Sequence, residues 1–400
     1  MGNQAAMRTT SKLRTLSVVA AGMPDWLPAE GQYGRIPMLN TLASQKPTPP
    51  SGTDPALVWG RSFGNILAEY SGAAFAEDYS PLGALVIACS GGHGGWWGND
   101  GHVADLSSLT WKRLIDPSPL ALAKNQREVI FDREWGELPD GTPAVTGHIY
   151  DSAETIPASW GVTGAKGAFV KLASAVDSPW IHAHSFDLAE PVWRRFTPAK
   201  QLHTGPALYP MSARDDKRQC FYVAQGSQRG ANHYWKIDKH GTITKIIGGF
   251  GVGAAVQCMG YSSELGLIIA MGSKDNPDTF GLRRPDSSQG PFKPGATGQR
   301  PTYAGSNGAH PEWDPDRHCF IFWDPLAETI YKLHPPDGES PTQPWSWSTE
   351  VLQKSAAFPP TVIRKAVGGQ WSKFRRIPAL KAFVYPASMT ELQIVRPKGA

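Results

Sequence analysis

The chain has 400 residues, of which 42 are Gly, 35 are Pro and 15 are Trp, while only 18% are charged. A helical protein of this length would carry more Glu, Lys and Leu, so the composition favours short strands joined by many turns. The net charge of +4 is too small to indicate a nucleic-acid-binding protein, and no stretch approaches the roughly 18 apolar residues of a membrane span.

Residues 1–15 are polar and basic, with Arg8, Lys12 and Arg14 and no acidic residue. They show no apolar period, so we expect a flexible arm that becomes ordered on a neighbouring protein subunit. The apolar run after the arm is a poor signal peptide, because it is short and no strong cleavage site follows. Trp26 and Leu27 are interpreted as an isolated strand whose sheet partners lie elsewhere in the chain.

The clearest strand pattern lies in residues 83–114. An apolar run over residues 84–89 predicts a buried strand, and Gly91, Gly92 and their neighbours predict a loop. Residues 102–106 predict a second strand, and Trp111 begins a third. The three strands form a meander.

A short strand, a polar turn and a strongly apolar strand recur six times along the chain. The apolar strands are centred near Leu85, Phe169, Phe221, Leu267, Phe320 and Phe383. The strongest internal match aligns Asp105 and Trp111 of the first repeat with Asp187 and Trp193 of the second. The fourth repeat loses the pattern after Met271, so residues 272–305 are expected to be mostly a long loop.

The sixth repeat ends near residues 392–395 after only three strands. The missing outer strand is assigned to Trp26 and Leu27, at the other end of the chain. A ring closed in this way has no free sheet edge, which removes the aggregation hazard of an open sheet.

The Gly91–Gly92 pair followed by Trp111 resembles a kelch-type blade, and the set of repeats over residues 16–397 resembles kelch-like propellers. Residues 374–378 and 381–384 also look like the final blade of bacterial and phage propellers related to the central domain of galactose oxidase. The resemblance implies an all-β fold in which residues 16–400 form a single six-bladed propeller. It implies no activity, because propellers carry unrelated functions.

The four cysteines, Cys89, Cys220, Cys258 and Cys319, each lie in an apolar strand-like run. We expect buried, unpaired thiols, and no CxxC spacing indicates zinc.

The enzymes related to galactose oxidase hold copper with two His and two Tyr, one Tyr being crosslinked to a Cys. The candidates here are His93, His102, His148, His182, His184, His310, Tyr150 and Tyr234. Because all four cysteines are expected to pack as core and no Tyr–His arrangement can be placed from spacing, we expect no metal and no other cofactor.

Loop acids form a second set of candidates, since glycoside hydrolysis needs a pair of carboxyl groups about 5–10 Å apart. The set comprises Asp100, Asp151, Glu154, Asp177 and Glu312. Solvated turn residues are the simpler interpretation. His182 and His184 lie on one face of a predicted strand, and without a third ligand they are expected to face solvent rather than bind a metal.

The loop with the sequence HGGWWGN supplies the candidate ligand-binding residues His93, Trp96, Trp97 and Asn99. Successive side chains of a strand point to opposite faces, so one Trp is available for stacking on a sugar or for a protein contact. The alternative is that both Trp side chains seal the interface between the first two blades.

These observations favour a non-enzymatic structural or binding module, such as a phage-tail component in a virion or an extracellular protein. Its expected partners are other protein subunits of a large assembly, and a glycan is the second kind of partner considered. The alternative function is a carbohydrate-active or copper-dependent oxidising enzyme acting at the mouth of the propeller.

Overall fold

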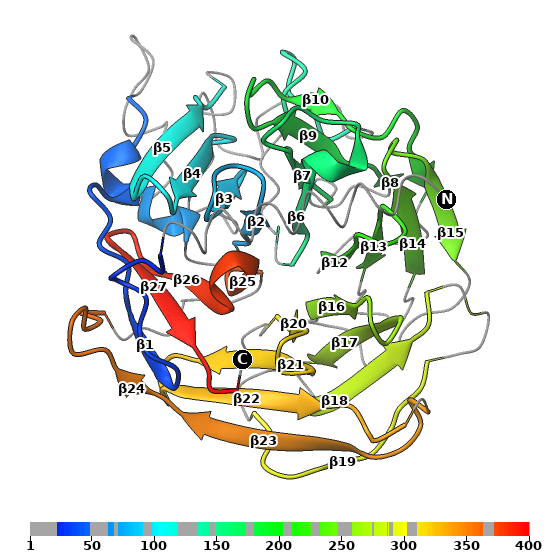
Figure 1. Cartoon of the computed structure of the whole chain (residues 1–400). Coiled ribbons are helices and arrows are strands. Elements are labelled where there is room, and N and C mark those ends of the chain that lie inside the picture. The colour runs from blue at the N-terminus through cyan, green and yellow to red at the C-terminus, as the bar shows by residue number, and fades with distance from the viewer. Residues whose placement is uncertain are drawn as a thin grey trace.

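The computed structural model describes residues 22–48, 63–67, 71–90, 96, 98–118, 135–143, 149, 151–172, 180–202, 210–225, 233–246, 258–273, 276–285, 287, 291–301, 310–338, 340–362 and 372–399. The arm predicted for residues 1–15 lies outside them. Six small sheets surround one axis, which confirms the six-bladed propeller (Figure 1).

Each blade begins with an inner strand beside the axis and continues outward through antiparallel neighbours. The inner strands are β2 (Ala74–Ala76), β6 (Ala153–Ile156), β12 (Pro210–Asp215), β16 (Cys258–Ser262), β20 (Glu312–Asp314) and β25 (Arg375–Ile377). The second strands are β3 (Ala84–Ala88), β7 (Ala168–Lys171), β13 (Cys220–Gln225), β17 (Leu267–Ser273), β21 (Cys319–Asp324) and β26 (Ala382–Ser388). The six predicted apolar strands are therefore the six second strands.

The outer part of each blade is less regular. The third strands are β4 (Gly101–Asp105), β9 (His184–Asp187), β14 (His233–Asp238), β18 (Asn276–Arg283), β22 (Thr329–His334) and β27 (Glu391–Arg396). The fourth strands are β5 (Thr110–Ile115), β10 (Arg194–Arg195), β15 (Ile243–Ile246), β23 (Trp345–Val351) and β1 (Gln32–Arg35). Two short strands extend blades 5 and 6 in parallel, β19 (Ala296–Thr297) on β23 and β24 (Gln353–Lys354) on β1.

The remaining described elements are short. A two-stranded ladder joins β8 (Trp180–Ile181) to β11 (Gln201–Leu202). The helices are single 3-10 turns, η1 (Leu42–Gln45), η2 (Phe63–Ile66), η3 (Ala158–Trp160) and η4 (Pro378–Leu380). None of the helices among the described residues is long and apolar enough to cross a membrane.

The second strands are mostly apolar because both of their faces are covered. In β3, all five residues are buried, and alternate side chains contribute to two different core clusters on the two sides of the blade. The four cysteines are buried and form no disulfide, as predicted. Burial raises the pKa of the Cys220 thiol to about 11 and that of Cys319 to about 12.

The internal match between blades 1 and 2 also holds in three dimensions. Asp105 accepts a hydrogen bond from the backbone N–H of Ser107 (3.0 Å), and Asp187 accepts one from Ala189 (2.7 Å). Each Asp is the last residue of the third strand of its blade, and its carboxylate stabilises the turn that follows. Trp111 and Trp193 are both buried.

The ring closes as expected, but the assigned closing strand was wrong. β1 pairs with β27, with Tyr33 opposite Val395, whereas Trp26 and Leu27 lie in a turn before β1. Trp26 is buried and packs into the core between blades 6 and 1. Its apolar side chain therefore indicated a buried position, but this position is not in a paired strand. Gly31, with φ of +80°, lets the chain turn into β1.

The long loop expected after Met271 was also wrong. β18 (Asn276–Arg283) pairs with β17 and gives blade 4 its third strand. Phe280 and Leu282, two residues apart in β18, are buried. The pattern was hidden because Pro277 and Gly281 interrupt the apolar sequence.

Ring closure generates a stability prediction. Tyr33 is 1% exposed in β1, and its ring lies 5.2 Å from that of Trp323 in blade 5. Tyr33→Ala should lower the free energy of unfolding by about 3–5 kcal/mol, because a large buried aromatic is lost from the closing strand. Leu39→Ala, at a side chain 77% exposed, is the control and should change it by less than about 0.5 kcal/mol. Equal denaturation midpoints for the two variants would contradict this role for β1.

Candidate functional site

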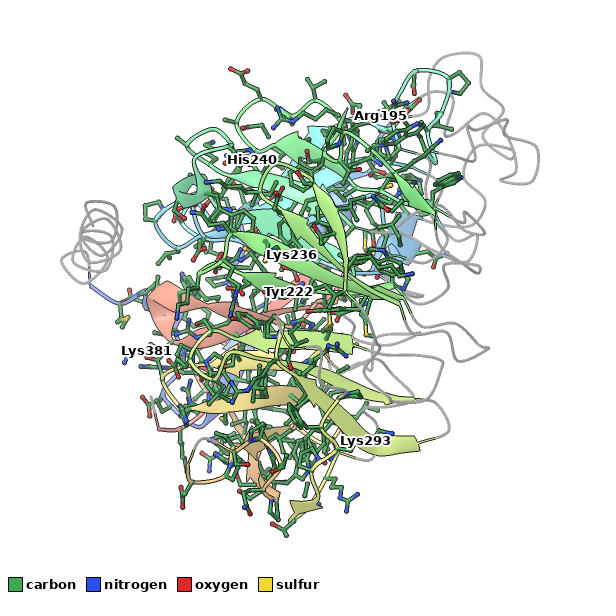
Figure 2. All side chains as sticks on the ribbon, turned by 90° about the vertical axis from the view of Figure 1, so that its right-hand side faces the viewer. Arg195, Tyr222, Lys236, His240, Lys293 and Lys381 are labelled. Carbon is green, nitrogen blue, oxygen red and sulfur yellow. The ribbon has the colours of Figure 1, made fainter. Side chains whose placement is uncertain are left out.

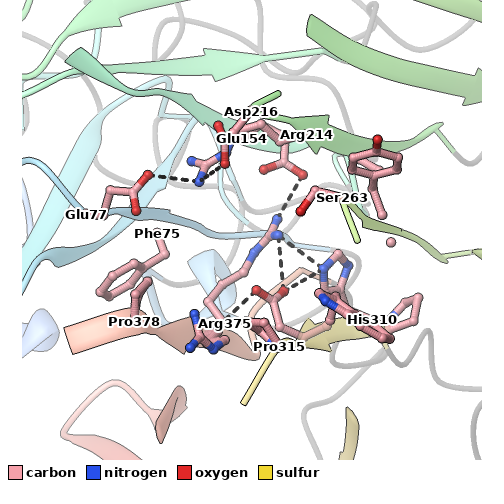
Figure 3. A pocket seen from close by; sticks show the side chains of 17 residues that line it. Phe75, Glu77, Glu154, Arg214, Asp216, Ser263, His310, Pro315, Arg375 and Pro378 are labelled. Atoms are coloured by element: carbon pink, nitrogen blue, oxygen red, sulfur yellow. Dashed lines mark hydrogen bonds and ion pairs between the residues drawn. The ribbon is translucent and has the colours of Figure 1, made fainter. Parts of the chain in front are cut away.

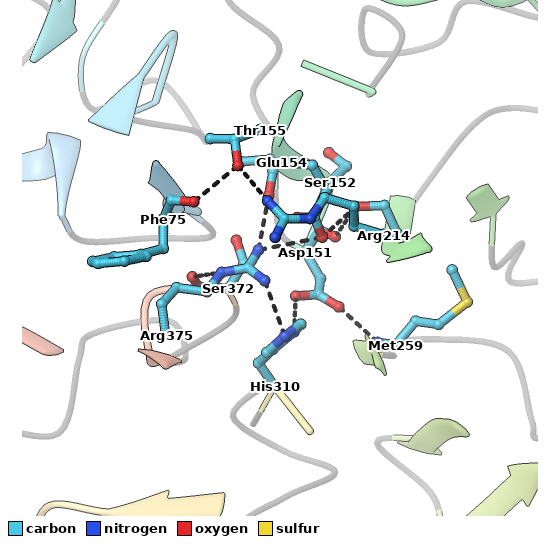
Figure 4. Close-up of polar contacts among 12 residues, drawn as sticks. Phe75, Asp151, Ser152, Glu154, Thr155, Arg214, Met259, His310, Ser372 and Arg375 are labelled. Carbon is cyan, nitrogen blue, oxygen red and sulfur yellow. Dashed lines mark hydrogen bonds and ion pairs between the residues drawn. The ribbon is translucent and has the colours of Figure 1, made fainter. Parts of the chain in front are cut away.

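A buried carboxylate, Asp151, joins four blades at the axis. It stands two residues before β6 in blade 2, and its Oδ2 accepts a hydrogen bond from the backbone N–H of Met259 in blade 4 (2.6 Å). Its Oδ1 lies 2.6 Å from Nδ1 of His310 in blade 5. Its backbone carbonyl accepts hydrogen bonds from the N–H (2.8 Å) and hydroxyl (2.9 Å) of Ser212 in blade 3. Figure 4 shows Met259 and His310 at the carboxylate of Asp151.

Arg375, the first residue of β25 in blade 6, connects the remaining blades. Its Nε donates to the carbonyl of Ala73 in blade 1 (3.1 Å), and its Nη2 donates to that of Ala153 in blade 2 (2.8 Å). Its Nη1 lies 3.7 Å from Glu312 of blade 5. Asp151 and Arg375 together therefore link all six blades (Figure 4). We refer to Asp151, His310 and Arg375 as the axial hub.

His310 is charged in this surrounding. Burial alone would lower its pKa, but the carboxylate of Asp151 and a 2.9 Å contact from Nε2 to Glu312 raise the pKa to about 9. Arg375 Nη1 lies 3.1 Å from the same Nε2, so two positive groups meet there. The carboxylates of Asp151, Glu154 and Glu312 offset this repulsion.

A pocket of about 310 Å³ lies next to the axial hub, and all six blades contribute to its lining. It lies at the end of the ring where the inner strands finish, because Glu77, Asp216 and Ser263 come directly after inner strands. The aromatic side chains in its wall are Phe75, Tyr261 and Trp313 (Figure 3).

Arg214 of β12 lies in the wall of this pocket and is held from several sides. Its guanidinium lies 3.1 Å from Glu77 in blade 1 and 3.1 Å from Asp216, and it donates to the hydroxyl of Thr155 (2.7 Å). The pocket wall thus presents fixed guanidinium and carboxylate groups side by side (Figure 3).

Two carboxyl groups of the pocket differ in acidity. Burial raises the pKa of Glu154, against the opposing charge of Arg375 at 3.5 Å. Burial acts in the same direction on Glu312, but the hydrogen bond from His310 and the charges of His310 and Arg375 lower its pKa to about 2. The pocket therefore holds one carboxyl group whose pKa is raised and one whose pKa is lowered.

Three of the five acids singled out in the sequence meet here, namely Asp151, Glu154 and Glu312. The expectation that they are solvated turn residues was wrong, because the inner strands carry them to the axis, where Asp151 and Glu154 are buried. Asp100 lies in blade 1, where it accepts a hydrogen bond from Trp96 Nε1 (2.7 Å). Asp177 lies outside the described residues.

The Trp-containing loop is only partly described. Trp96 is buried in the core between blades 6 and 1, so the alternative that it seals the interface between blades 1 and 2 was wrong. The buried Asn99 donates to the Thr142 hydroxyl (2.9 Å) and accepts from the N–H of Ser118 (2.8 Å). These two side chains contact protein. The other predicted binding and docking residues, His93, Trp97, Arg8, Lys12 and Arg14, lie outside the described residues, so ligand binding and docking there stay predictions.

His182 and His184 are fully buried, so the expectation that they face solvent was wrong. The strands of blade 2 turn them into the protein, beside Trp135 and Glu137. Within the described ranges, no three His, Cys, Asp or Glu side chains are grouped so as to hold a metal ion. His148 and Tyr150, two further copper candidates, lie outside those ranges.

Sequence reasoning missed the arginines. Arg214 and Arg375 were not singled out, and His310 was considered only as a copper candidate. The available signal was a charged residue in each of two short inner strands, since a charge in such a strand has to find a partner at the axis.

Comparisons with known proteins found similarity only among solved structures. No family model matches the chain, and no curated protein matches it. A variant of the α-L-arabinofuranosidase Arb93A from Fusarium graminearum, solved with an iminosugar inhibitor, is similar at 10% identity and a TM-score of 0.48, over 92% of this chain and 98% of that one. The allergen Mala s 1 of Malassezia sympodialis is similar at 9% identity and a TM-score of 0.42, over 83% and 93%. Streptogramin B lyase is similar at 10% identity and a TM-score of 0.41, over 84% and 95%. These values carry no argument about function.

The charge on His310 generates a pH prediction. Its pKa in the folded protein, about 9, exceeds the ordinary value of 6.5, so its stabilising effect is complete below pH 6.5 and disappears as the pH rises through 9. His310→Gln should therefore lower the free energy of unfolding most below pH 6.5. By about pH 9 this loss should be smaller by an amount on the order of a few kcal/mol.

The measurement is chemical denaturation of the wild type and the variant across this pH range. The free energies of unfolding of the two proteins have to be compared at each pH, because Lys373 also titrates in this range. Burial lowers its pKa to about 7, so its contribution makes the fold more stable as the pH rises above 7, opposite to the effect of His310. The exposed His240 provides the control His240→Gln. A constant difference between wild type and His310→Gln would show that His310 is neutral in the fold.

Proposed function

We propose that the protein is a non-enzymatic binding module that takes a sugar, or a polyol of similar size, into the axial pocket. The observation that carries the proposal is the lining of that pocket, which combines paired guanidinium and carboxylate groups with aromatic side chains. Its volume of about 310 Å³ is at the low end for small-molecule sites and suits one small ligand.

The charge pairing favours an uncharged, hydroxyl-rich ligand. Arg214 is held by Glu77 and Asp216, and Arg375 by Glu154 and Glu312, so neither sign of charge dominates. A sugar hydroxyl donates to a carboxylate and accepts from a guanidinium at the same time. The apolar face of the sugar would pack on an aromatic ring of the wall.

Glycan-array screening followed by calorimetry with the best monosaccharide tests the proposal. Arg214→Ala should weaken binding about 10- to 100-fold, because hydrogen bonds to a charged donor are lost. Arg194→Ala, at an exposed arginine of β10 outside the pocket, should leave the affinity unchanged. Binding that is equally strong in both variants would place the sugar elsewhere on the protein.

The proposal extends to a structural role, with the propeller as a kelch-like component of a phage tail or a comparable extracellular assembly. Support comes from the basic segment of residues 1–15, which contains no acidic residue and no apolar period to order it. Such a segment suits an acidic surface on another subunit.

Deleting residues 1–15 should leave the thermal unfolding midpoint unchanged and abolish incorporation into the assembly. The contact of the full-length protein should weaken as salt rises, because exposed charges are screened over about 8–10 Å at physiological ionic strength. Sedimentation of the assembled particle measures both effects. Normal incorporation of the truncated protein would exclude this role for the arm.

A carbohydrate-active enzyme is the second candidate, favoured by the difference in acidity between Glu154 and Glu312. In glycoside hydrolysis one carboxylic acid protonates the leaving oxygen while a carboxylate acts from the other side of the sugar. Turnover of aryl glycosides by the wild type that is lost in both Glu154→Gln and Glu312→Gln, with binding retained, would replace the non-enzymatic proposal. The same measurement without turnover in the wild type would favour binding alone.

A further inference from the structure

A pair of buried imidazoles in blade 2 lies apart from the axial pocket. His182 lies between β8 and β9, and His184 begins β9. Arg195, which β10 places opposite His184, lies toward the face away from the turns that carry His240 and Lys381 (Figure 2). The axial pocket lies at the side of those turns, where the inner strands end. The two sites therefore lie toward opposite ends of the ring.

Three ring nitrogens of these two histidines have no hydrogen-bond partner among the described residues. His182 is fully buried, and neither of its ring nitrogens meets a hydrogen-bond partner among the described residues. Nδ1 of the fully buried His184 also has no partner within those ranges. Leaving a buried polar group unpaired costs about 1–3 kcal/mol, so these three nitrogens require a ligand or an ordered water.

The ring geometry suits a metal ion. The two imidazole centroids are 5.3 Å apart, with an angle of 85° between the ring planes. Two imidazoles bound tetrahedrally to one ion, with metal–nitrogen bonds of about 2.0–2.1 Å, place their centroids roughly 5 Å apart. Apolar side chains could make the same packing contact without burying unpaired nitrogens, so ring packing alone does not account for two histidines at this position.

The outer contacts of His184 match those of a metal-bound histidine. Its Nε2 lies 2.9 Å from Glu137 Oε1, which fixes Nε2 as the donor and leaves the lone pair on Nδ1. Glu137 in turn accepts two hydrogen bonds from Arg195, at 2.6 and 2.7 Å. A carboxylate that orients the far nitrogen of an imidazole is the usual support of a metal ligand.

We propose that His182 and His184 bind one borderline transition-metal ion, of the zinc or copper class, with Glu137 as a positioning residue. Imidazole nitrogen is the ligand type that suits these ions. The described residues supply two protein ligands, and water or a small exogenous ligand completes the coordination. The opposing feature is Lys171, which lies opposite His184 in the β7–β9 ladder and would repel a cation when charged.

Metal content after incubation of the full-length protein with Zn²⁺ or Cu²⁺ and removal of the excess tests the proposal. The wild type should retain about one ion per chain, and His182→Ala should retain none. Glu137→Gln should bind 10- to 100-fold more weakly, as is typical when an outer carboxylate is lost. His240→Ala, at an exposed histidine, is the control and should match the wild type.

Two further measurements separate metal binding from a purely structural role. The electron paramagnetic resonance spectrum of the Cu²⁺-loaded wild type should show coupling to two imidazole nitrogens, and His184→Ala should show at most one. Lys171→Met should bind the ion at least as tightly as the wild type. Absence of a retained ion in the folded wild type, or retention that survives His182→Ala, would overturn the proposal.

Discussion

The propeller depends on the axial hub, where Asp151 contacts His310 and Arg375 donates to backbone carbonyls of other blades. Six blades must meet at one axis, and the inner strands are only three to six residues long, so their ends bring backbone groups and charges into a small buried space. Asp151 contacts blades 3, 4 and 5, while Arg375 contacts blades 1, 2 and 5. Each blade is thus tied to others far away in sequence.

The hub explains why charge is tolerated at the centre of an apolar ring. Removing one partner of a buried ion pair costs about 3–5 kcal/mol, because the other charge remains uncompensated. Arg375 also donates to the carbonyl oxygens of Ala73 and Ala153, which would otherwise need partners of their own. The positive charge on His310 follows from the same arrangement, since carboxylates lie on both sides of its ring.

The binding chemistry of the pocket follows from this architecture. The charged side chains in its wall are held in place by ion pairs between blades, and this limits their rotation before a ligand arrives. A ligand then meets donors and acceptors in fixed positions, and less conformational entropy is lost on binding. The proposed choice between binding and catalysis depends on Glu154, because burial raises the pKa of its carboxyl group.

The repeats could be predicted from local sequence patterns. Apolar second strands, the Asp105 and Asp187 turns and a sixth unit one strand short are local patterns, and they predicted six blades closed by the N-terminal part of the chain. The sequence misplaced the closing strand at Trp26, because a buried aromatic marks core in a strand and in a turn alike. Only the tertiary structure decided that Tyr33 and its neighbours pair with β27.

The grouping of the site residues depends on closure of the six blades into a ring. Asp151, Glu154 and Glu312 were visible as acids, but they lie up to 161 residues apart in a chain of 400, and only closure around the axis brings them together. His182 and His184 were visible as a pair on one strand face, and the packing of blade 2 decided that this face is buried. Sequence determines which strands are apolar, because burial on two faces demands it. Which charges meet depends on the positions of six blades at once, and no local pattern contains that information.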